Sequence, residues 1–392
     1  MKTTTLIRIY LLIFLLSLAS SSSGQDGRMY VPDMGRRVQP QMEVLATEDR
    51  EEYECRLVEF SVDASHIGES GRKVRATERI RAYLLVPDGA SRHSKKPAVI
   101  MLHDHGARFD IGKEKLAKPI EQSDDGYGAP EYISRSSRQW IDKNFDGIYM
   151  ADSLARSGYV VLVADALYWG ERSNPGAQEW SRLNYSENAN PEVSFARIKE
   201  LKTIVYEGQR AVYDSLLHSG IIWAEKMLRD DAASVSLLKG LPYVDKKNIG
   251  AFGFSMGAHR CWLLSAFCKD VKCGVALSWI TTLNGYEGNN ASDLSMRIQP
   301  MRDGMDFGDI GMFLAPKPML FLNGNADKLF PADMVQTAFY KLQKHYAEYN
   351  AAEGISTEPP FEPLQTVFFD GPHHCGKDVQ QTIVEFLDSN LK

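Results

Sequence analysis

Short apolar runs alternate with amphipathic stretches along most of the chain. Seven runs of apolar and β-branched residues predict strands at 80–86, 98–103, 159–164, 248–252, 274–279, 318–323 and 364–369. Apolar residues at helical spacing predict helices at 148–156, 209–229, 258–267, 332–346 and 378–391. The later strand runs are almost continuously apolar, which is typical of strands covered on both faces. The alternation therefore predicts an α/β fold, with a mostly parallel, twisted sheet and helices on both faces.

Three long polar segments interrupt this alternation, at 104–145, 168–206 and 281–316. Each follows a predicted strand, and ligands in open α/β sheets bind beyond the carboxyl ends of the strands. Because long loops inside a compact domain are usually functional, we expect these segments to form loop insertions over a site. Residues 24–79 are expected to form an irregular or antiparallel N-terminal extension, and residues 80–392 the catalytic domain.

The first residues have the pattern of a secretory signal peptide. Lys2 and Arg8 supply positive charge, residues 9–18 form an apolar run too short to cross a bilayer, and small residues follow. We expect residues 1–23 to be removed and the protein to be exported, either to the periplasm or out of the cell. No later segment has about 18 uninterrupted apolar residues, so no membrane association is expected after cleavage.

Composition and charge narrow the class of partner. Of the 392 residues, 44% are hydrophobic and 24% are charged, which is typical of a globular protein. The formal net charge is −6 and the lysines and arginines form no run, so binding to nucleic acid is not expected. Five cysteines are too few for a disulfide scaffold, and their pairing is left open.

The strongest chemical signal is the motif G-F-S-M-G at 253–257. It lies directly after a predicted strand and directly before a predicted helix, which is the context of a nucleophile elbow. Ser255 is therefore the candidate nucleophile, and the backbone N–H of Met256 is a candidate oxyanion donor. The alternative is a glycine-rich turn with a capping serine, but the flanking strand and helix favour catalysis.

A nucleophilic serine needs a base and an orienting acid, which follow it in the order Ser, Asp or Glu, His in this architecture. Asp327 lies in the turn after the strand predicted at 318–323, and Asp333 is a weaker alternative. His373 and His374 follow the last predicted strand. We favour His373 as the base because it is nearer the glycine turn. His374 is then expected to pack nearby or to donate a hydrogen bond.

The second oxyanion donor is expected in the loop after an early strand, here residues 103–107. A backbone N–H in the stretch from Asp104 to Gly106 is the candidate, with Asp104 and His105 favoured. His103 and His105 alternate along this loop as metal ligands sometimes do, but no third ligand accompanies them at a recognisable spacing. We therefore expect no metal and no other cofactor.

Several motifs together resemble one group of enzymes. They are LHDHG at 102–106, IGKE at 111–114, WGER at 169–172, GFSMGAHR at 253–260, NGxxDxxFP at 323–331 and GxHH at 371–374. From about residue 80 onward the chain resembles the exported, dienelactone-hydrolase-like carbohydrate esterases of gut Bacteroidetes, which have the α/β-hydrolase fold. It most resembles the pectin methylesterases of carbohydrate esterase family 19. True dienelactone hydrolases use a cysteine where this chain has Ser255, so their reaction is not implied.

The resemblance implies removal of methyl esters from galacturonic acid residues of pectin, a plant polysaccharide, or of its oligosaccharides. Neighbouring sugars then carry carboxylates, which cations in the long loops would bind. The first candidates are Arg172 and Arg108. Lys113, Arg135 and Arg138 are further candidates. Trp169, with Tyr168 and Trp279, is a candidate for stacking on sugar faces. The alternative is that these cations are solvated at the surface and that these aromatic residues belong to the core.

Two other functions fit the same residues. One is an acetylesterase on xylan or another plant polysaccharide, with the same triad but without a group that binds carboxylates. The other is a catalytically silent relative that only binds carbohydrate, against which the intact Ser255, Asp327 and His373 set argues.

Overall fold

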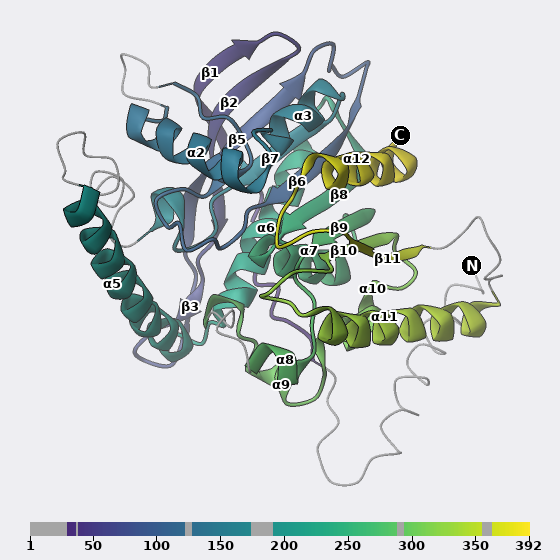
Figure 1. The fold of residues 1–392 in the computed structure, drawn as a ribbon. Helices are drawn as coiled ribbons and strands as arrows, with labels where there is room; N and C mark the ends of the chain where they lie inside the picture. Colours follow the sequence, from purple (N-terminus) through teal and green to yellow (C-terminus); the bar gives the residue numbers. More distant parts are fainter. Residues whose placement is uncertain (1–29, 37, 122–127, 174–190, 288–293, 355–362) are drawn as a thin grey trace.

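The computed structural model describes residues 30–36, 38–121, 128–173, 191–287, 294–354 and 363–392. Within these residues one nine-stranded sheet has the order β1-β2-β5-β7-β6-β8-β9-β10-β11 (Figure 1). The six strands from β7 to β11 pair in parallel, whereas β1, β2 and β5 form an antiparallel edge. The bounds are β1 (Met42–Arg50), β2 (Tyr53–Asp63), β5 (Thr77–Pro87), β6 (Lys96–Leu102), β7 (Val160–Ala164), β8 (Val244–Phe254), β9 (Cys273–Leu277), β10 (Met319–Gly324) and β11 (Leu364–Phe369). A separate hairpin joins β3 (His66–Ile67) and β4 (Lys73–Val74).

Helices cover both faces of the sheet, and each face has its own apolar core. One face carries α2 (Glu131–Asn144), α3 (Met150–Arg156) and α12 (Lys377–Leu391). The other carries α6 (Trp223–Gly240), α7 (Met256–Phe267) and α11 (Ala332–Glu353). Strands β7 and β9 are buried along their whole length because side chains of both orientations enter a core. The predicted fold class is therefore confirmed.

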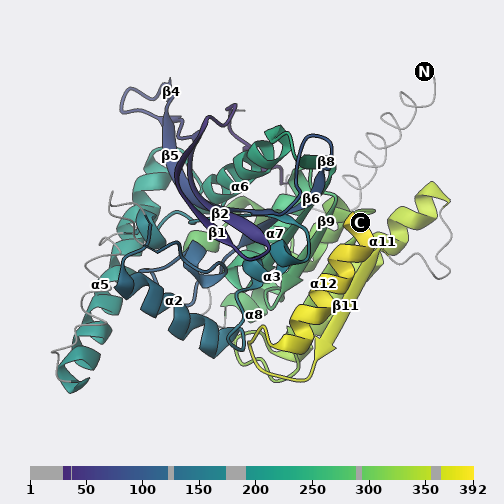
Figure 2. The same cartoon turned by 90° about the horizontal axis from the view of Figure 1, so that it is seen from above.

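The remaining elements lie at the carboxyl ends of the parallel strands or beside them. Helix α5 (Pro191–His218) stands along one side of the molecule, and α12 and β11 lie along the opposite side (Figure 2). The short elements are η1 (Lys113–Lys115), η2 (Gly170–Arg172), α8 (Leu283–Glu287), η3 (Leu294–Met296), α9 (Gln299–Arg302), η4 (Phe307–Ile310) and α10 (Gly311–Leu314). Most of them belong to the three long polar segments.

One prediction about elements is wrong, and the structure adds detail to two others. The helix predicted at 209–229 is wrong, because the chain breaks between α5 and α6, where Gly220 has a φ of +69°. Only glycine adopts that conformation without strain. The polar segment 104–145 contains α2, whose buried face carries Ile133, Trp140 and Ile141. The segment predicted as an N-terminal extension supplies β1 and β2, which continue the central sheet.

Three further predictions concern the signal peptide, membrane-spanning helices and the cysteines. The predicted signal peptide, residues 1–23, lies outside the described residues. In the described part of the chain, no helix is both long enough and apolar enough to cross a membrane. All five cysteines are described, and all are free thiols.

Candidate active site

Ser255 occupies the sharp turn between β8 and α7. Its φ of 54° and ψ of −124° are strained for a residue with a side chain. The backbone is held there by the Ser255 N–H, which donates to Leu277 O at 2.8 Å. A Cβ at position 253 would overlap the Gly257 carbonyl, and one at 257 would overlap the Leu102 carbonyl. The two glycines of the motif therefore allow strand, turn and helix to approach closely enough to form the elbow.

Asp327 and His373 are brought together by the turns after β10 and β11. His373 Nδ1 lies 2.7 Å from Asp327 Oδ2. The other oxygen, Oδ1, accepts from the N–H groups of Leu329 at 2.8 Å and Phe330 at 3.1 Å. The Asp327 side chain is fully buried. Because a carboxylate only accepts, His373 carries a proton on Nδ1, and Nε2 is the nitrogen that accepts a proton in the neutral ring.

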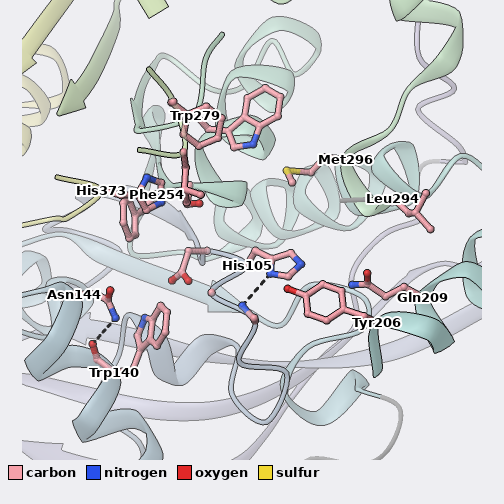
Figure 3. Close-up of a pocket in the computed structure, with 16 residues that line it drawn as sticks. His105, Trp140, Asn144, Tyr206, Gln209, Phe254, Trp279, Leu294, Met296 and His373 are labelled. Carbon is pink, nitrogen blue, oxygen red and sulfur yellow. Dashed lines mark hydrogen bonds between the residues drawn. The ribbon is translucent and has the colours of Figure 1, made fainter. Parts of the chain in front are cut away.

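Ser255 and His373 line the same cavity, which has a volume of about 550 Å³ (Figure 3). The His373 ring packs between Phe254, with ring centroids 4.9 Å apart, and Phe330, which stacks on it at 5.8 Å. These rings fix the plane of the imidazole. Ser255 is only 9% exposed, so the cavity is its route to solvent.

His374 lies elsewhere. Its Nε2 is 2.8 Å from Asp146 Oδ1, and it is not among the described residues that line the cavity. The same Asp146 carboxylate accepts from the Lys377 N–H at the start of α12. Hydrogen bonding to His374 lowers the pKa of Asp146. Of the two histidines that the sequence left as alternatives, only His373 is placed beside a buried acid and the cavity.

Two buried side chains, Lys115 and His103, hold the loop after β6 through hydrogen bonds to its backbone carbonyls. Lys115 Nζ donates to Asp104 O at 2.9 Å and to His105 O at 2.8 Å. His103 Nε2 accepts from the Ala166 N–H at 3.0 Å, so its proton is on Nδ1, which donates to Asp104 O at 2.9 Å. Burial holds the pKa of His103 well below its usual range, which keeps the ring neutral.

These contacts orient two peptide groups. In a trans peptide the N–H points opposite to the preceding C=O. The carbonyls of Asp104 and His105 are directed at Lys115, which does not line the cavity in the described structure. The N–H groups of His105 and Gly106 therefore point away from Lys115, and both residues line the cavity. Of the predicted donors, the N–H of His105 fits this geometry, and Asp104 and His105 both line the cavity.

The side chains expected to bind substrate are mostly engaged in the scaffold. Arg172 Nη1 and Nη2 bind Asp230 at 3.0 Å and Glu78 at 2.6 Å. Arg108 forms two hydrogen bonds to Asp110. Neither arginine is among the described residues lining the cavity. The prediction that they meet substrate carboxylates does not match these positions, because both charges are already neutralised by buried acids.

Two of the three aromatic candidates belong to the scaffold, and the third lines the cavity. Trp169 is fully buried, and its Nε1 donates to His105 O at 3.0 Å, which adds a third support behind the loop. Tyr168 is also buried, and its hydroxyl donates to Val205 O. Trp279 lines the cavity. Lys113, Arg135 and Arg138 all form ion pairs, with Asp165, Glu131 and Asp142 respectively.

Sequence reasoning missed much of the cavity wall. Helix α5 contributes Tyr206 and Gln209, three residues apart on one face, and α2 contributes Trp140 and Asn144, four residues apart (Figure 3). The spacing of three or four residues within each of these pairs was the signal in the sequence that could have placed them on one face of a helix. Leu294 and Met296 add apolar wall from η3.

The described wall of the cavity carries an acid and no lysine or arginine. Among the described residues that line it there is no lysine or arginine, and Asp104 is the acid on its wall. Burial raises the pKa of Asp104, and the Lys115 ammonium partly opposes that shift. Across the described residues, no cluster of three or more His, Cys, Asp or Glu side chains is arranged to hold a metal ion. The arrangement can activate a hydroxyl and stabilise an oxyanion with the protein's own groups.

Comparisons with known proteins show what the chain is similar to. Residues 139–279 match the model of the dienelactone hydrolase family. The protein YtaP of Bacillus subtilis, provisionally assigned as a hydrolase, is 22% identical over 281 residues, which cover 70% of this chain and 75% of YtaP.

Two solved structures resemble the whole fold. A Bacteroides fragilis protein, provisionally assigned as an acetyl xylan esterase, has a TM-score of 0.53 and 17% identity, over 85% of this chain and 70% of its own. The glucuronoyl esterase of Solibacter usitatus has a TM-score of 0.54 and 10% identity, over 91% of this chain and 88% of its own. With the strand order, these matches show that the chain has the α/β-hydrolase fold.

Proposed function

We propose that the protein is a serine carboxylic ester hydrolase that acts on an ester-substituted carbohydrate. One observation carries the proposal. A strained strand–helix turn places Ser255 on the wall of the same cavity as His373, and His373 is hydrogen-bonded to the buried Asp327. A nucleophile, a base and an orienting acid are the groups that acyl transfer through an enzyme-bound ester requires.

In this mechanism Ser255 Oγ attacks the ester carbonyl while His373 Nε2 takes its proton. Asp327 keeps the imidazole in the required tautomer and balances the charge of the imidazolium. The N–H of Met256 and the N–H groups of His105 and Gly106 stabilise the oxyanion, and one such donor contributes about 10² to 10³ in rate. The alcohol leaves with the proton from His373, and water then releases the acid from Ser255.

The substrate class rests on the relatives and on the cavity. Two solved structures with this fold are described as acetyl xylan and glucuronoyl esterases, both of which act on carbohydrate esters. Three aromatic residues line the cavity, and of these Tyr206 is exposed while Trp140 and Trp279 are buried, so the ring of Tyr206 is the one that suits the apolar face of a sugar.

The acyl group is best taken as acetyl on a neutral glycan. Pectin carries carboxylates beside each methyl ester, whereas the described cavity wall has no cation and does have the acid Asp104. The methyl ester of galacturonic acid, which the motif resemblance implies, is the second candidate. The apolar run at 9–18 supports export, which would bring the enzyme to either polysaccharide.

Assaying acetate and methanol separately distinguishes the two candidates. The protein is incubated with acetylated xylan oligosaccharides and with methyl-esterified galacturonan oligosaccharides, and Ser255→Ala is the control. We expect acetate release that Ser255→Ala abolishes. Methanol release alone would favour the pectin methylesterase. If wild type and Ser255→Ala are equally inactive on every ester, including 4-nitrophenyl acetate, the protein is a silent carbohydrate binder.

A further inference from the structure

His373 lies on the short segment between β11 and α12, which is attached to the rest of the fold on both sides of this residue. On the β11 side, the Gly371 N–H donates to Asn325 Oδ1 at 3.2 Å, and Gly371 O accepts from the Ala326 N–H at 3.0 Å. These bonds join the segment to the turn that carries Asp327. In the described part of the chain, the backbone of His373 itself forms no hydrogen bond. The position of its imidazole therefore depends on the attachments on either side.

On the α12 side, the attachment is made by the end of α2 and the turn that follows it. Asp146 in this turn uses both of its carboxylate oxygens. Its Oδ1 lies 2.8 Å from His374 Nε2, and its Oδ2 accepts from the Lys377 N–H at 3.0 Å. Between these two contacts, the Cys375 N–H donates to Asn144 O at 3.0 Å, and Cys375 is fully buried. The residues that directly follow the base are therefore fastened to one turn.

The same turn also supports the imidazole ring. Phe145 packs edge-on against Phe254, with ring centroids 5.6 Å apart and an angle of 82° between the ring planes. Phe254 packs against the His373 ring at 4.9 Å (Figure 3). Gln380 Nε2 donates to Phe145 O at 3.0 Å and to Cys375 O at 2.8 Å, which joins the turn to α12 once more. The turn after α2 therefore holds both the backbone beside the base and the aromatic ring against which the base packs.

Asp146 has the properties of an anchor rather than of a core residue. Its side chain is 42% exposed, so it is not needed to fill the core. Its φ is +52°, in the left-handed region that aspartate adopts more readily than most side chains. Hydrogen bonding to His374 lowers the pKa of Asp146, so the carboxylate stays charged, which also favours its place beside the first turn of α12. Both hydrogen bonds that it forms within the described structure go to the segment bearing the base.

We propose that Asp146 is a positioning residue of the active site, which holds His373 in the place that proton transfer from Ser255 requires. It acts through His374 and the start of α12 and does not itself touch the substrate. The inference rests on the proposed function, because it assigns a further residue to the same proton transfer. His374 then serves to bind Asp146 and is not a second base. General-base catalysis depends on geometry, and a misplacement of about 1 Å costs about 10² in rate.

Replacement of Asp146 tests this role. Asp146→Ala removes both acceptors, and we expect kcat for 4-nitrophenyl acetate to fall by about 10- to 100-fold with KM nearly unchanged. Asp146→Asn keeps an oxygen for the Lys377 N–H and offers an amide N–H to His374 Nε2, so it should recover most of the lost kcat. A wild-type kcat in Asp146→Ala overturns the inference. A loss that appears in KM instead of kcat overturns it as well.

Asp245→Ala is the matched control. The Asp245 carboxylate also accepts from one backbone N–H and one side chain, those of Lys247 at 3.1 Å and Asn248 at 2.8 Å. It lies at the start of β8, whereas Ser255 follows the end of that strand. We expect Asp245→Ala to keep the kcat of wild type. Equal losses of kcat from Asp245→Ala and Asp146→Ala would mean that any such bond in the fold has this effect, and would overturn the inference.

Variants of His374 test the route of the contact. His374→Ala should lower kcat, whereas His374→Gln, whose amide can still donate to Asp146, should retain most of it. Residues that act through one contact give non-additive losses, so the double variant with Asp146→Ala should lose no more than Asp146→Ala alone. Equal losses from His374→Ala and His374→Gln would assign the chemistry to the imidazole of His374 and would contradict the proposal. So would a double variant whose loss equals the product of the two single losses.

A proton resonance separates this inference from the proposed function. The His373 Nδ1–H donated to Asp327 gives a far-downfield ¹H signal, which Asp327→Asn identifies by its loss, and its observation needs no substrate. We expect Asp146→Ala to shift or broaden this signal and Asp245→Ala to leave it unchanged. That pattern in a protein that hydrolyses no ester would refute the proposed function and support the positioning role. An active wild type whose signal and kcat are both unaffected by Asp146→Ala overturns the inference and leaves the proposed function in place.

Discussion

Two buried polar regions follow β6 and β7, and they differ in whether their groups are paired. In the first, which we call the charge cluster, Lys113 Nζ lies 3.0 Å from Asp165, 2.9 Å from Glu171 and 3.0 Å from Glu114. Lys113 is fully buried, and these carboxylates raise its pKa well above the usual range against the effect of burial. In the second, the cavity wall, buried atoms of Asp104, Trp140 and Gln209 lack partners.

The difference separates scaffold from site. Both regions contain residues from motifs that carry the family resemblance, such as IGKE and WGER in the charge cluster. A buried charge whose bonds are all directed at neighbours has none left for a ligand, so the charge cluster positions loops. The cavity wall carries Ser255 and His373 beside its unpaired buried atoms, so it is the region where the proposed reaction takes place. Four experiments test this difference between the two regions.

The largest effect is expected from Asp327→Asn. An amide at this position donates to His373 and forces its proton onto Nε2, the nitrogen that must accept from Ser255. We expect kcat for 4-nitrophenyl acetate to fall by about 10⁴ with little loss of stability. Asp333→Asn, at an exposed position in the first turn of α11, is the control. Equal losses from the two variants would refute the assignment of the acid.

In the charge cluster, Lys113→Met leaves Asp165 and its neighbours as unpaired buried carboxylates. The free energy of unfolding should fall by about 3–5 kcal/mol, measured by denaturant titration. Arg138→Met removes an exposed ion pair with Asp142 and should cost less than about 0.5 kcal/mol. If Lys113→Met is as stable as Arg138→Met but inactive, the charge cluster belongs to the site after all.

Lys115 connects the two regions, because it is buried like the charge cluster but holds the loop of the cavity wall. Lys115→Met removes one donor from each of the carbonyls of Asp104 and His105 and leaves only His103 and Trp169 to hold them, so the opposite N–H groups are oriented less firmly. We expect kcat to fall by about 10² while KM changes much less. Lys317→Met is the matched control, since Lys317 also donates to two backbone carbonyls, those of Ser265 and Cys268, on another part of the fold. A control that loses as much kcat would remove Lys115 from the mechanism.

The last prediction concerns pH. Burial lowers the pKa of Lys115 from 10.5 to about 8, so the unfolded chain holds this proton more tightly than the native state does. The associated stability is fully present above pH 10.5 and is lost as the pH falls through about 8. Relative to Lys115→Met, wild type should therefore gain stability from pH 8 to 10.5, by at most about 1.4 kcal/mol per pH unit. A flat difference across this range would show that the ammonium is not desolvated.

The sequence was sufficient to predict the groups whose roles depend on chain order and strand ends. The parallel strands, the elbow at Ser255 and the turns bearing Asp327 and His373 follow from short-range patterns that the fold obeys. The break at Gly220 was missed because the apolar spacing continues through it, and a left-handed residue leaves that spacing intact.

The substrate-facing residues were harder to predict because their roles depend on contacts between distant segments. Arg172 looks available in sequence, but Glu78 and Asp230, which neutralise it, come from β5 and α6. Gln209 looks like an ordinary helix residue until the fold buries its amide without a partner. Pairing is a property of three-dimensional neighbours, and no local pattern records it.

The elements that carry the two kinds of group suggest how such a protein can change in evolution. Ser255, Asp327 and His373 are borne by turns of the central sheet, whereas Tyr206 and Gln209 come from α5, which stands at the side of the molecule. Replacement of that single helix would alter which glycan is accepted and leave the acyl-transfer machinery in place. Relatives that share the sheet and differ in this helix would then form a natural series of specificities built on one chemistry.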